Sequence, residues 1–212
     1  MKKYAFPVMV AIACLAVAPP AAAQPLKPSA VVLRLAQQNP GLQSYTARVL
    51  FDVDLHAFLT IHPTLNATYY FKRPDKAELD FDTIPVFAEQ FEHLYAALAS
   101  PDRWPAIYDI RFTRKPLANE PYELALTPKK TGNVDRVLVS VDSVSFGVTR
   151  MEWRYKNGSW IVMQQTNAKV GDYLLPQGQV GDFKLPSYKA HVVATYSTYR
   201  LNVPIPDSVF KH

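Results

Sequence analysis

The chain has 212 residues, of which 49% are hydrophobic, and it carries 23 Lys and Arg against 18 Asp and Glu. The charges are scattered without a basic block, which argues against a nucleic-acid-binding protein. The 18 prolines and 7 glycines predict many short elements with stiff connections and exclude a low-complexity chain.

The N-terminus has the features of a secretory signal peptide. Lys2 and Lys3 precede the apolar run YAFPVMVAIACLAVA, and an A-x-A site follows at residues 21–23. The apolar run is too short for a transmembrane helix. Residues 1–23 are therefore predicted to be a cleaved signal peptide, and residues 24–212 a single domain that is soluble in the periplasm.

Cys14 is the only cysteine of the chain. Its lipidation is an alternative to its removal with the signal peptide, but the preceding Ala11, Ile12 and Ala13 lack the leucine that usually precedes such a site. Without lipidation the mature chain has no thiol nucleophile and no disulfide. Its stability must then come from the core of one domain.

The first predicted elements are a short helix and a long strand. Residues 29–38 read as a helix with Ser29 as its N-cap, ended by the sequence Asn-Pro-Gly at 39–41. From Tyr45 to Ile61 every odd position is apolar or aromatic, whereas most even positions are polar. This period of two predicts one strand with a dry face and a wet face. Because a strand of that length must curl, it indicates a strongly twisted sheet or a barrel wall.

The next segments switch from strands to a helix. A turn is predicted at residues 62–66, followed by strands over 68–72 and 78–81 that are joined by a turn at Pro74 and Asp75. Apolar side chains then recur at helical spacing and predict an amphipathic helix over residues 85–98, with Pro85 near its first turn.

The rest of the chain reads as strands. Alternation predicts them at residues 122–127, 137–141, 151–155, 160–165 and 189–201, and Asn157-Gly158 marks a hairpin turn. Many antiparallel strands with two or three helices predict an α+β fold, in which a large curled sheet has helices on one side.

The sequence predicts neither an enzyme nor a metal or cofactor site. It has no phosphate-binding glycine loop, no H-E-x-x-H and no G-x-S-x-G motif. The closest histidines, His56 and His62, are six residues apart, which is not a usual zinc-ligand spacing. Two carboxylate pairs could share a strand face for acid–base chemistry, but both lie in the wet phase of their strands; they are Asp52 with Asp54, and Asp80 with Asp82.

The surplus of apolar residues allows two interpretations. The apolar face of the sheet and the apolar stripe of the 85–98 helix could form an ordinary core. Alternatively, a helix that closes a curled sheet leaves a cavity that opens when the helix moves.

The chain resembles the LolA/LolB-like family of periplasmic outer-membrane lipoprotein carrier and sorting proteins. The segments that carry the resemblance are LQSYTARV, YFKRPDKAELDF, YELALTPKK and VDRVLVSVD, in that order after a signal and a short helix. The resemblance implies an incomplete antiparallel barrel, covered on its concave side by helices, with a hydrophobic cavity for lipoprotein acyl chains. It also implies that Arg73, next to Pro74, latches the lid helices through their backbone carbonyls; a solvated strand-end arginine is the alternative. The 85–98 helix departs from the family, which usually has a strand hairpin there.

The leading hypothesis is a monomeric, non-enzymatic periplasmic carrier of an acyl chain, a lipid or an acylated lipoprotein. Envelope membrane proteins are candidate partners for loading and delivery. The floor of the cavity is predicted to consist of Phe51, Val53, Leu55, Tyr69, Phe71, Leu79 and Phe81. The lid is predicted to consist of Phe87, Phe91, Leu94, Tyr95 and Leu98. The alternatives are a regulatory or protein-interaction module with a packed core, and a hydrolase, which would need an inward-pointing Asp52–Asp54 pair.

Overall fold

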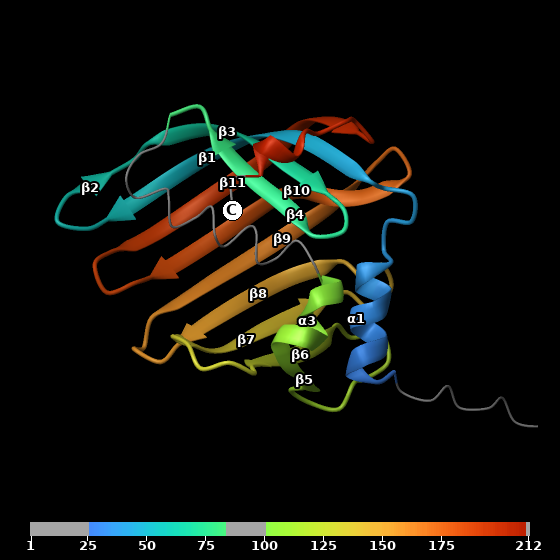
Figure 1. The fold of residues 1–212 in the computed structure, drawn as a ribbon. Coiled ribbons are helices and arrows are strands. Elements are labelled where there is room, and N and C mark those ends of the chain that lie inside the picture. Colours follow the sequence, from blue (N-terminus) through green and yellow to red (C-terminus); the bar gives the residue numbers. More distant parts are fainter. Residues whose placement is uncertain (1–25, 84–100, 211–212) are drawn as a thin grey trace, which may run out of the picture.

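One curled antiparallel sheet of 11 strands dominates the computed structural model, which describes residues 26–83 and 101–210 (Figure 1). The strands run in the spatial order β4-β3-β1-β11-β10-β9-β8-β7-β6-β5, and β2 pairs with β1. Their bounds are β1 Ser44–His56, β2 Thr60–Ile61, β3 Thr64–Lys72, β4 Lys76–Phe81, β5 Tyr108–Phe112, β6 Tyr122–Pro128, β7 Val134–Val141, β8 Val148–Tyr155, β9 Trp160–Val170, β10 Tyr173–Lys184 and β11 Lys189–Leu201. The predicted fold class is confirmed.

Among the described residues, two α-helices lie on the concave side of the sheet, at one end of it (Figure 1). They are α1 (Pro28–Ala36) and α3 (Trp104–Ile107), and short 3-10 turns are η1 (Pro101–Arg103) and η2 (Asp207–Val209). The N-cap of α1 is Lys27, so the predicted Ser29 cap is wrong. Pro28 takes the first helical position, which its fixed φ favours, and Ser29 falls inside the first turn.

The alternating pattern of β1 is confirmed from Tyr45 to Leu55, whose odd positions are all buried. The prediction that the same strand continues to Ile61 is wrong, because the chain reverses over residues 57–59 and β2 folds back on β1. Phe58 at the tip of this reversal is 98% exposed. The apolar end of the pattern therefore lies at the surface and not on a barrel wall.

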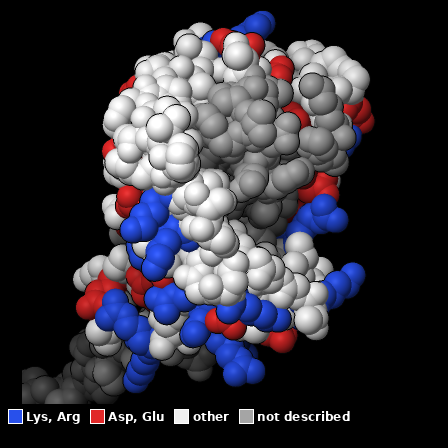
Figure 2. All heavy atoms as spheres, turned by 90° about the vertical axis from the view of Figure 1, so that its left-hand side faces the viewer, with Lys and Arg blue, Asp and Glu red and all other residues white. Residues whose placement is uncertain are grey.

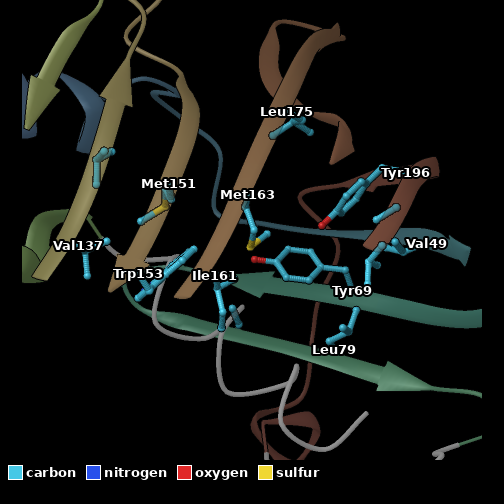
Figure 3. Packing of buried hydrophobic residues seen from close by; sticks show 14 of the residues in the cluster. Val49, Tyr69, Leu79, Val137, Met151, Trp153, Ile161, Met163, Leu175 and Tyr196 are labelled. Atoms are coloured by element: carbon cyan, nitrogen blue, oxygen red, sulfur yellow. The ribbon is translucent and has the colours of Figure 1, made fainter. Parts of the chain in front are cut away.

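The core lies against the concave face of the sheet, which we call the inner face. Side chains from distant strands meet there, with Val49 and Leu79 on one side and Trp153 and Ile161 on another (Figure 3). Leu79 and Leu124 are fully buried. Because the sheet curls, residues far apart in the sequence share one apolar interior.

Several predicted boundaries shift and two strands were missed. β3 begins at Thr64, inside the predicted turn, and β4 begins at Lys76. The turn at Pro74-Asp75 and the hairpin at Asn157-Gly158 are confirmed, and Gly158 has a φ of +81° there. The missed strands are β5 and β10. The predicted helix over residues 85–98 lies outside the described residues.

Charged side chains on one face of the molecule gather at the level of β5–β8, where Lys and Arg are interspersed with Asp and Glu (Figure 2). Among the described helices, none is long and apolar enough to cross a membrane.

Candidate binding cavity

A cavity of about 180 Å³ lies on the inner face, where the end of α1 meets the sheet. Its wall combines apolar side chains, such as Leu35 of α1, Met151 of β8 and Leu175 of β10, with tyrosines and amides. The volume is below the roughly 300–1,000 Å³ of ordinary small-molecule pockets. The space therefore suits one chemical group of a ligand, and a complete lipid would require rearrangement.

Tyrosines form one wall of this cavity. The ring centroid of Tyr45 lies 5.7 Å from that of Tyr69, 5.2 Å from that of Phe71 and 5.8 Å from that of Tyr199. Tyr196 packs edge-on against Tyr69 at 6.2 Å. Such pairs contribute about 0.5–1.5 kcal/mol each beyond area burial, so they stabilise this wall.

Two phenols of this wall, Tyr45 and Tyr69, have raised pKa values. Burial raises the pKa of Tyr69 to about 12. Burial also raises the pKa of Tyr45 well above its usual value, with smaller contributions from Tyr69 and Tyr199. Both hydroxyls therefore remain protonated at physiological pH and can donate hydrogen bonds.

A row of hydrogen-bonded polar side chains, which we call the amide row, crosses β11, β10 and β9 beside the tyrosines. The Tyr196 hydroxyl donates to Gln179 Oε1 at 3.0 Å, and Gln179 Nε2 donates to Gln165 Oε1 at 2.8 Å. Gln165 Nε2 then donates to Asn167 Oδ1 at 2.7 Å, and Asn167 Nδ2 to the carbonyl of Val148 at 2.9 Å. All five residues line the cavity, so its wall is polar as well as aromatic.

Arg73 follows β3 and points toward the end of α1. Its backbone N–H donates to the carbonyl of Gln43 at 2.8 Å. Its Nη2 donates to the carbonyls of Asn39 at 3.2 Å and Ala36 at 3.4 Å. These carbonyls belong to the last turn of α1 and the residues after it, where a helix leaves acceptors without intrahelical partners and where a cation is favoured.

Two further side chains hold the same end of α1. Asn39 makes a pair of hydrogen bonds with β10, in which Nδ2 donates to the carbonyl of Leu174 at 2.9 Å and Oδ1 accepts from its N–H at 2.8 Å. Gln38 Nε2 donates to the carbonyl of Ser145 at 2.9 Å. The end of α1 is thus tethered to β10, to the β3–β4 turn and to the β7–β8 turn.

The predicted site residues fall into three groups. Tyr69, Phe71 and Arg73 line the cavity. The other predicted floor residues are buried in the core but are not among the cavity-lining residues; they are Phe51, Val53, Leu55, Leu79 and Phe81. The predicted lid residues lie outside the described residues; they are Phe87, Phe91, Leu94, Tyr95 and Leu98.

Sequence reasoning did not find Tyr45, Tyr196 or the amides as cavity residues. A signal was present on β9, where the inward phase of Ile161 and Met163 continues as Gln165 and Asn167. Two polar residues in the phase that faces a core indicate a buried polar site.

Asp52 and Asp54 lie on the face of β1 opposite the buried residues, away from the cavity. Asp52 Oδ1 accepts a hydrogen bond from Thr64 at 3.1 Å. Asp54 Oδ1 lies 3.1 Å from His56 Nε2 and 3.2 Å from His62 Nδ1. The inward-pointing pair required by the hydrolase alternative is not formed. Within residues 26–83 and 101–210, no group of three or more His, Cys, Asp or Glu side chains could hold a metal ion.

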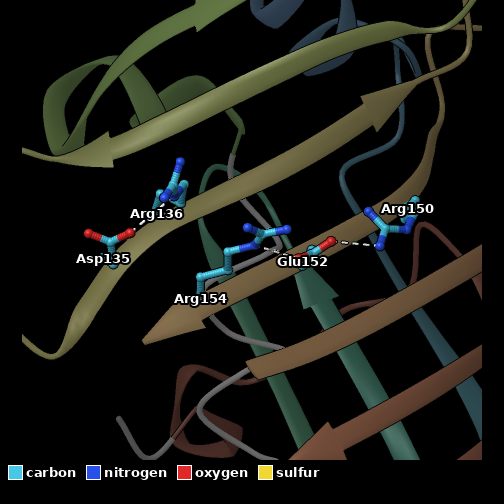
Figure 4. A network of polar contacts seen from close by, with 5 residues as sticks. All are labelled: Asp135, Arg136, Arg150, Glu152 and Arg154. Atoms are coloured by element: carbon cyan, nitrogen blue, oxygen red, sulfur yellow. Dashed lines mark hydrogen bonds and ion pairs between the residues drawn. The ribbon is translucent and has the colours of Figure 1, made fainter. Parts of the chain in front are cut away.

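A second polar cluster lies on the outer face of β8 (Figure 4). Glu152 is only 8% exposed and lies 2.6 Å from both Arg150 Nη2 and Arg154 Nε. Burial raises the pKa of Glu152, but the hydrogen bonds from the two arginines outweigh it, so the net pKa is below the usual value. The carboxylate is therefore paired and ionised. It stabilises the sheet and has no place in the cavity, because Met151 and Trp153 hold the inward positions of β8.

Comparison with solved structures identifies this curled, open sheet with helices on its concave side as the LolA-like fold. No protein-family model matches the chain, and no curated protein matches its sequence.

Three solved structures carry the comparison. A LolA superfamily protein from Nitrosomonas europaea is 12% identical, with a TM-score of 0.57 over 88% of this chain and 98% of that one. A domain from Vibrio parahaemolyticus assigned to outer membrane lipoprotein sorting is 10% identical, with a TM-score of 0.63 over 85% of this chain and 94% of that one. A DUF1329 family protein from Desulfovibrio piger is 14% identical, with a TM-score of 0.57 over 86% of this chain and 95% of that one. At these identities the similarity establishes the fold alone.

Proposed function

We propose that the protein is a non-enzymatic periplasmic carrier that holds an acyl chain, a lipid or a lipoprotein anchor on the inner face of its sheet. Residues 1–23 direct export, and the mature chain acts as a monomer. The observation that carries the proposal is a cavity with apolar and aromatic walls on the concave side of a LolA-like sheet.

Burial of methylenes supplies the driving force for binding. Each buried CH₂ contributes about 0.8 kcal/mol, so an acyl chain gains affinity without specific contacts. Because the cavity holds about 180 Å³, the bound ligand must displace side chains or a covering segment. The helix predicted from sequence at residues 85–98 is the proposed lid, with Phe91 at the centre of its apolar stripe.

The test is the recovery of ligand with the protein purified from a bacterial periplasm. Native mass spectrometry and solvent extraction are expected to show one lipid or acylated species per chain. Val148→Phe fills the cavity wall and should reduce the bound fraction at least about fivefold. Val180→Phe is the matched control, because Val180 is 37% exposed on the neighbouring part of the sheet and does not line the cavity. Purified protein without any bound amphiphile, which also takes none up from added lipid, contradicts the proposal.

The small cavity favours a second candidate, a regulatory or protein-interaction module of the same fold. Most inward-facing side chains are already buried, as a packed core requires. This candidate predicts a stoichiometric protein partner whose binding is unchanged by Val148→Phe, whereas the carrier predicts a ligand whose bound fraction falls.

A further inference from the structure

The inner face of β9, β10 and β11 changes from polar to apolar along the strands. Gln165 of β9 lies opposite Gln179 of β10, and further along the same pair Ile161 lies opposite Phe183. These four side chains share one face because positions two apart on a strand point to the same side. The face therefore has a polar end at the cavity and an apolar end where β9 begins and β10 ends.

A pair of methionines lies between the two ends. Met151 and Met163 are opposite each other on β8 and β9, and the next inward pair is Trp153 with Ile161. Figure 3 shows the methionines between Leu175 on one side and Trp153 and Ile161 on the other. Methionine is unbranched and adapts its rotamers readily, so this pair can yield to an inserted chain more easily than the tryptophan can.

The amide row has hydrogen-bonding capacity beyond the bonds that hold it together. Each side-chain amide has two N–H donors and an oxygen with two lone pairs. Within the described part of the chain, Gln165 uses one N–H toward Asn167 and one lone pair toward Gln179. Asn167 uses one N–H toward the carbonyl of Val148. Both residues are partly buried, and each of the two amides thus has a second N–H to donate to a group in the cavity.

The charges of the cavity wall determine which kind of ligand head group it favours. The amide row and the tyrosines are neutral, and Arg73 directs its Nη2 to the carbonyls of Asn39 and Ala36. Asp102, the other charged residue in the described part of the lining, is exposed. An anionic head group held by Gln165 and Asn167 would meet no cation at those two amides and would pay a large desolvation cost. Only an anion that reached Arg73, whose buried Nε has no hydrogen-bond partner within the described residues, would find an opposite charge.

We infer that the ligand is an amphiphile with a neutral, carbonyl- or hydroxyl-bearing head group, bound by Gln165 and Asn167, whose acyl chain passes Met151 toward the apolar end. This inference rests on the proposed carrier function and specifies its ligand. It adds polar recognition to a site that sequence reasoning described as apolar.

The experiment compares three probes with one acyl chain, below the concentrations at which they form micelles. They are monopalmitoylglycerol, palmitate and palmitoyl lysophosphatidate, with neutral, carboxylate and phosphate head groups. Titration of the mature protein, followed by tryptophan fluorescence, is expected to show that the neutral probe binds about tenfold tighter than either anion.

The variant Gln165→Leu tests the residue. It should weaken the neutral probe by about fivefold to tenfold, the worth of one or two hydrogen bonds, and leave palmitate within about twofold. Gln164→Leu is the matched control, since this neighbour on β9 is exposed on the other face and should change no affinity.

The possible results distinguish a failure of the head-group assignment from a failure of the proposed carrier function. Equal binding of all three probes by the wild type, or preference for an anion, overturns the head-group assignment and leaves the carrier function standing. Binding of no probe overturns both. If Gln165→Leu does not fold, the wild-type ranking of the probes still decides the question.

Discussion

Replacement of Arg73 by methionine should release the end of α1 without unfolding the sheet. A hydrogen bond to a charged group contributes about 1.5–3 kcal/mol when its geometry is good. The two bonds from Nη2, at 3.2 and 3.4 Å, are long, and Arg73 is only partly buried. In addition, within the described residues its buried Nε has no hydrogen-bond partner, so removing the guanidinium also relieves a desolvation cost. The net local loss is expected to be about 1 kcal/mol.

Hydrogen exchange of backbone amides measures this loss directly. A loss of about 1 kcal/mol corresponds to roughly fivefold faster exchange, and it should appear at the buried α1 residues Val31, Val32 and Leu35. Arg73→Lys should give an intermediate effect, because a compact ammonium cannot span two carbonyls as a guanidinium does. Arg111→Met on β5 is the control, since Arg111 is exposed.

The pattern of exchange decides between a tether and a general stabilising role. Unchanged exchange in α1 of Arg73→Met would refute the tether. Equal acceleration in α1 and in the central strands β1 and β11 would show global destabilisation, and would refute it as well.

Three other predictions concern stability. Phe51→Ala should cost about 3–5 kcal/mol in urea unfolding, because this side chain is 4% exposed, whereas Phe58→Ala at 98% exposure should stay within about 0.5 kcal/mol. Glu152 has a folded-state pKa below its unfolded value. The stability that its ionised carboxylate contributes is therefore present above about pH 4.3 and is lost as the pH falls through the folded pKa. The difference in urea midpoint between the wild type and Glu152→Gln should shrink in acid, and a constant difference contradicts this prediction. Gly181→Ala should lower the melting temperature, because a Cβ at this position would lie 2.8 Å from the ring of Phe183. Gly132→Ala is the control and should not lower it, because a Cβ there meets nothing within 4 Å. Equal melting temperatures of the two variants would show that the Phe183 ring moves aside freely.

The overlong strand predicted from residues 45–61 has a geometric explanation. Leu55 lies opposite Ile61 and His56 opposite Thr60, across a three-residue loop. Directly opposed residues point to the same side of a sheet, so a loop of odd length keeps odd positions on one face. Alternation therefore continues through the reversal, and no periodicity argument could separate one strand from this hairpin.

β10 was missed for a different reason. Pro176 and two glycines interrupt its pattern, and proline and glycine in a run argue against a central strand. The structure accommodates Pro176 and Gly178 at a register shift between them, opposite β9, whereas Gly181 pairs regularly with Met163. Four cavity-lining residues were lost with this strand, namely Leu174, Leu175, Pro176 and Gln179. Tyr69, Phe71 and Arg73 were accessible to prediction because they lie on a regular strand and its turn.

The tethers of α1 lie at the polar end of the inner face, and this placement determines where a ligand enters. Arg73 and Asn39 fix the end of α1 beside the amide row, whereas the apolar end is filled by Trp153, Ile161 and Phe183. Breaking a few exposed or half-buried hydrogen bonds costs less than opening a packed core, so the polar end opens first. An amphiphile that enters there must pass its chain beyond the amides before its head group meets them.

Loosening of α1 should therefore speed both uptake and release and leave the preference among head groups unchanged. A stopped-flow comparison of Arg73→Met with the wild type, using the neutral probe and palmitate, measures both quantities. Faster exchange together with a lost preference would mean that Arg73 also contacts the ligand, and that the tether and the binding site are one.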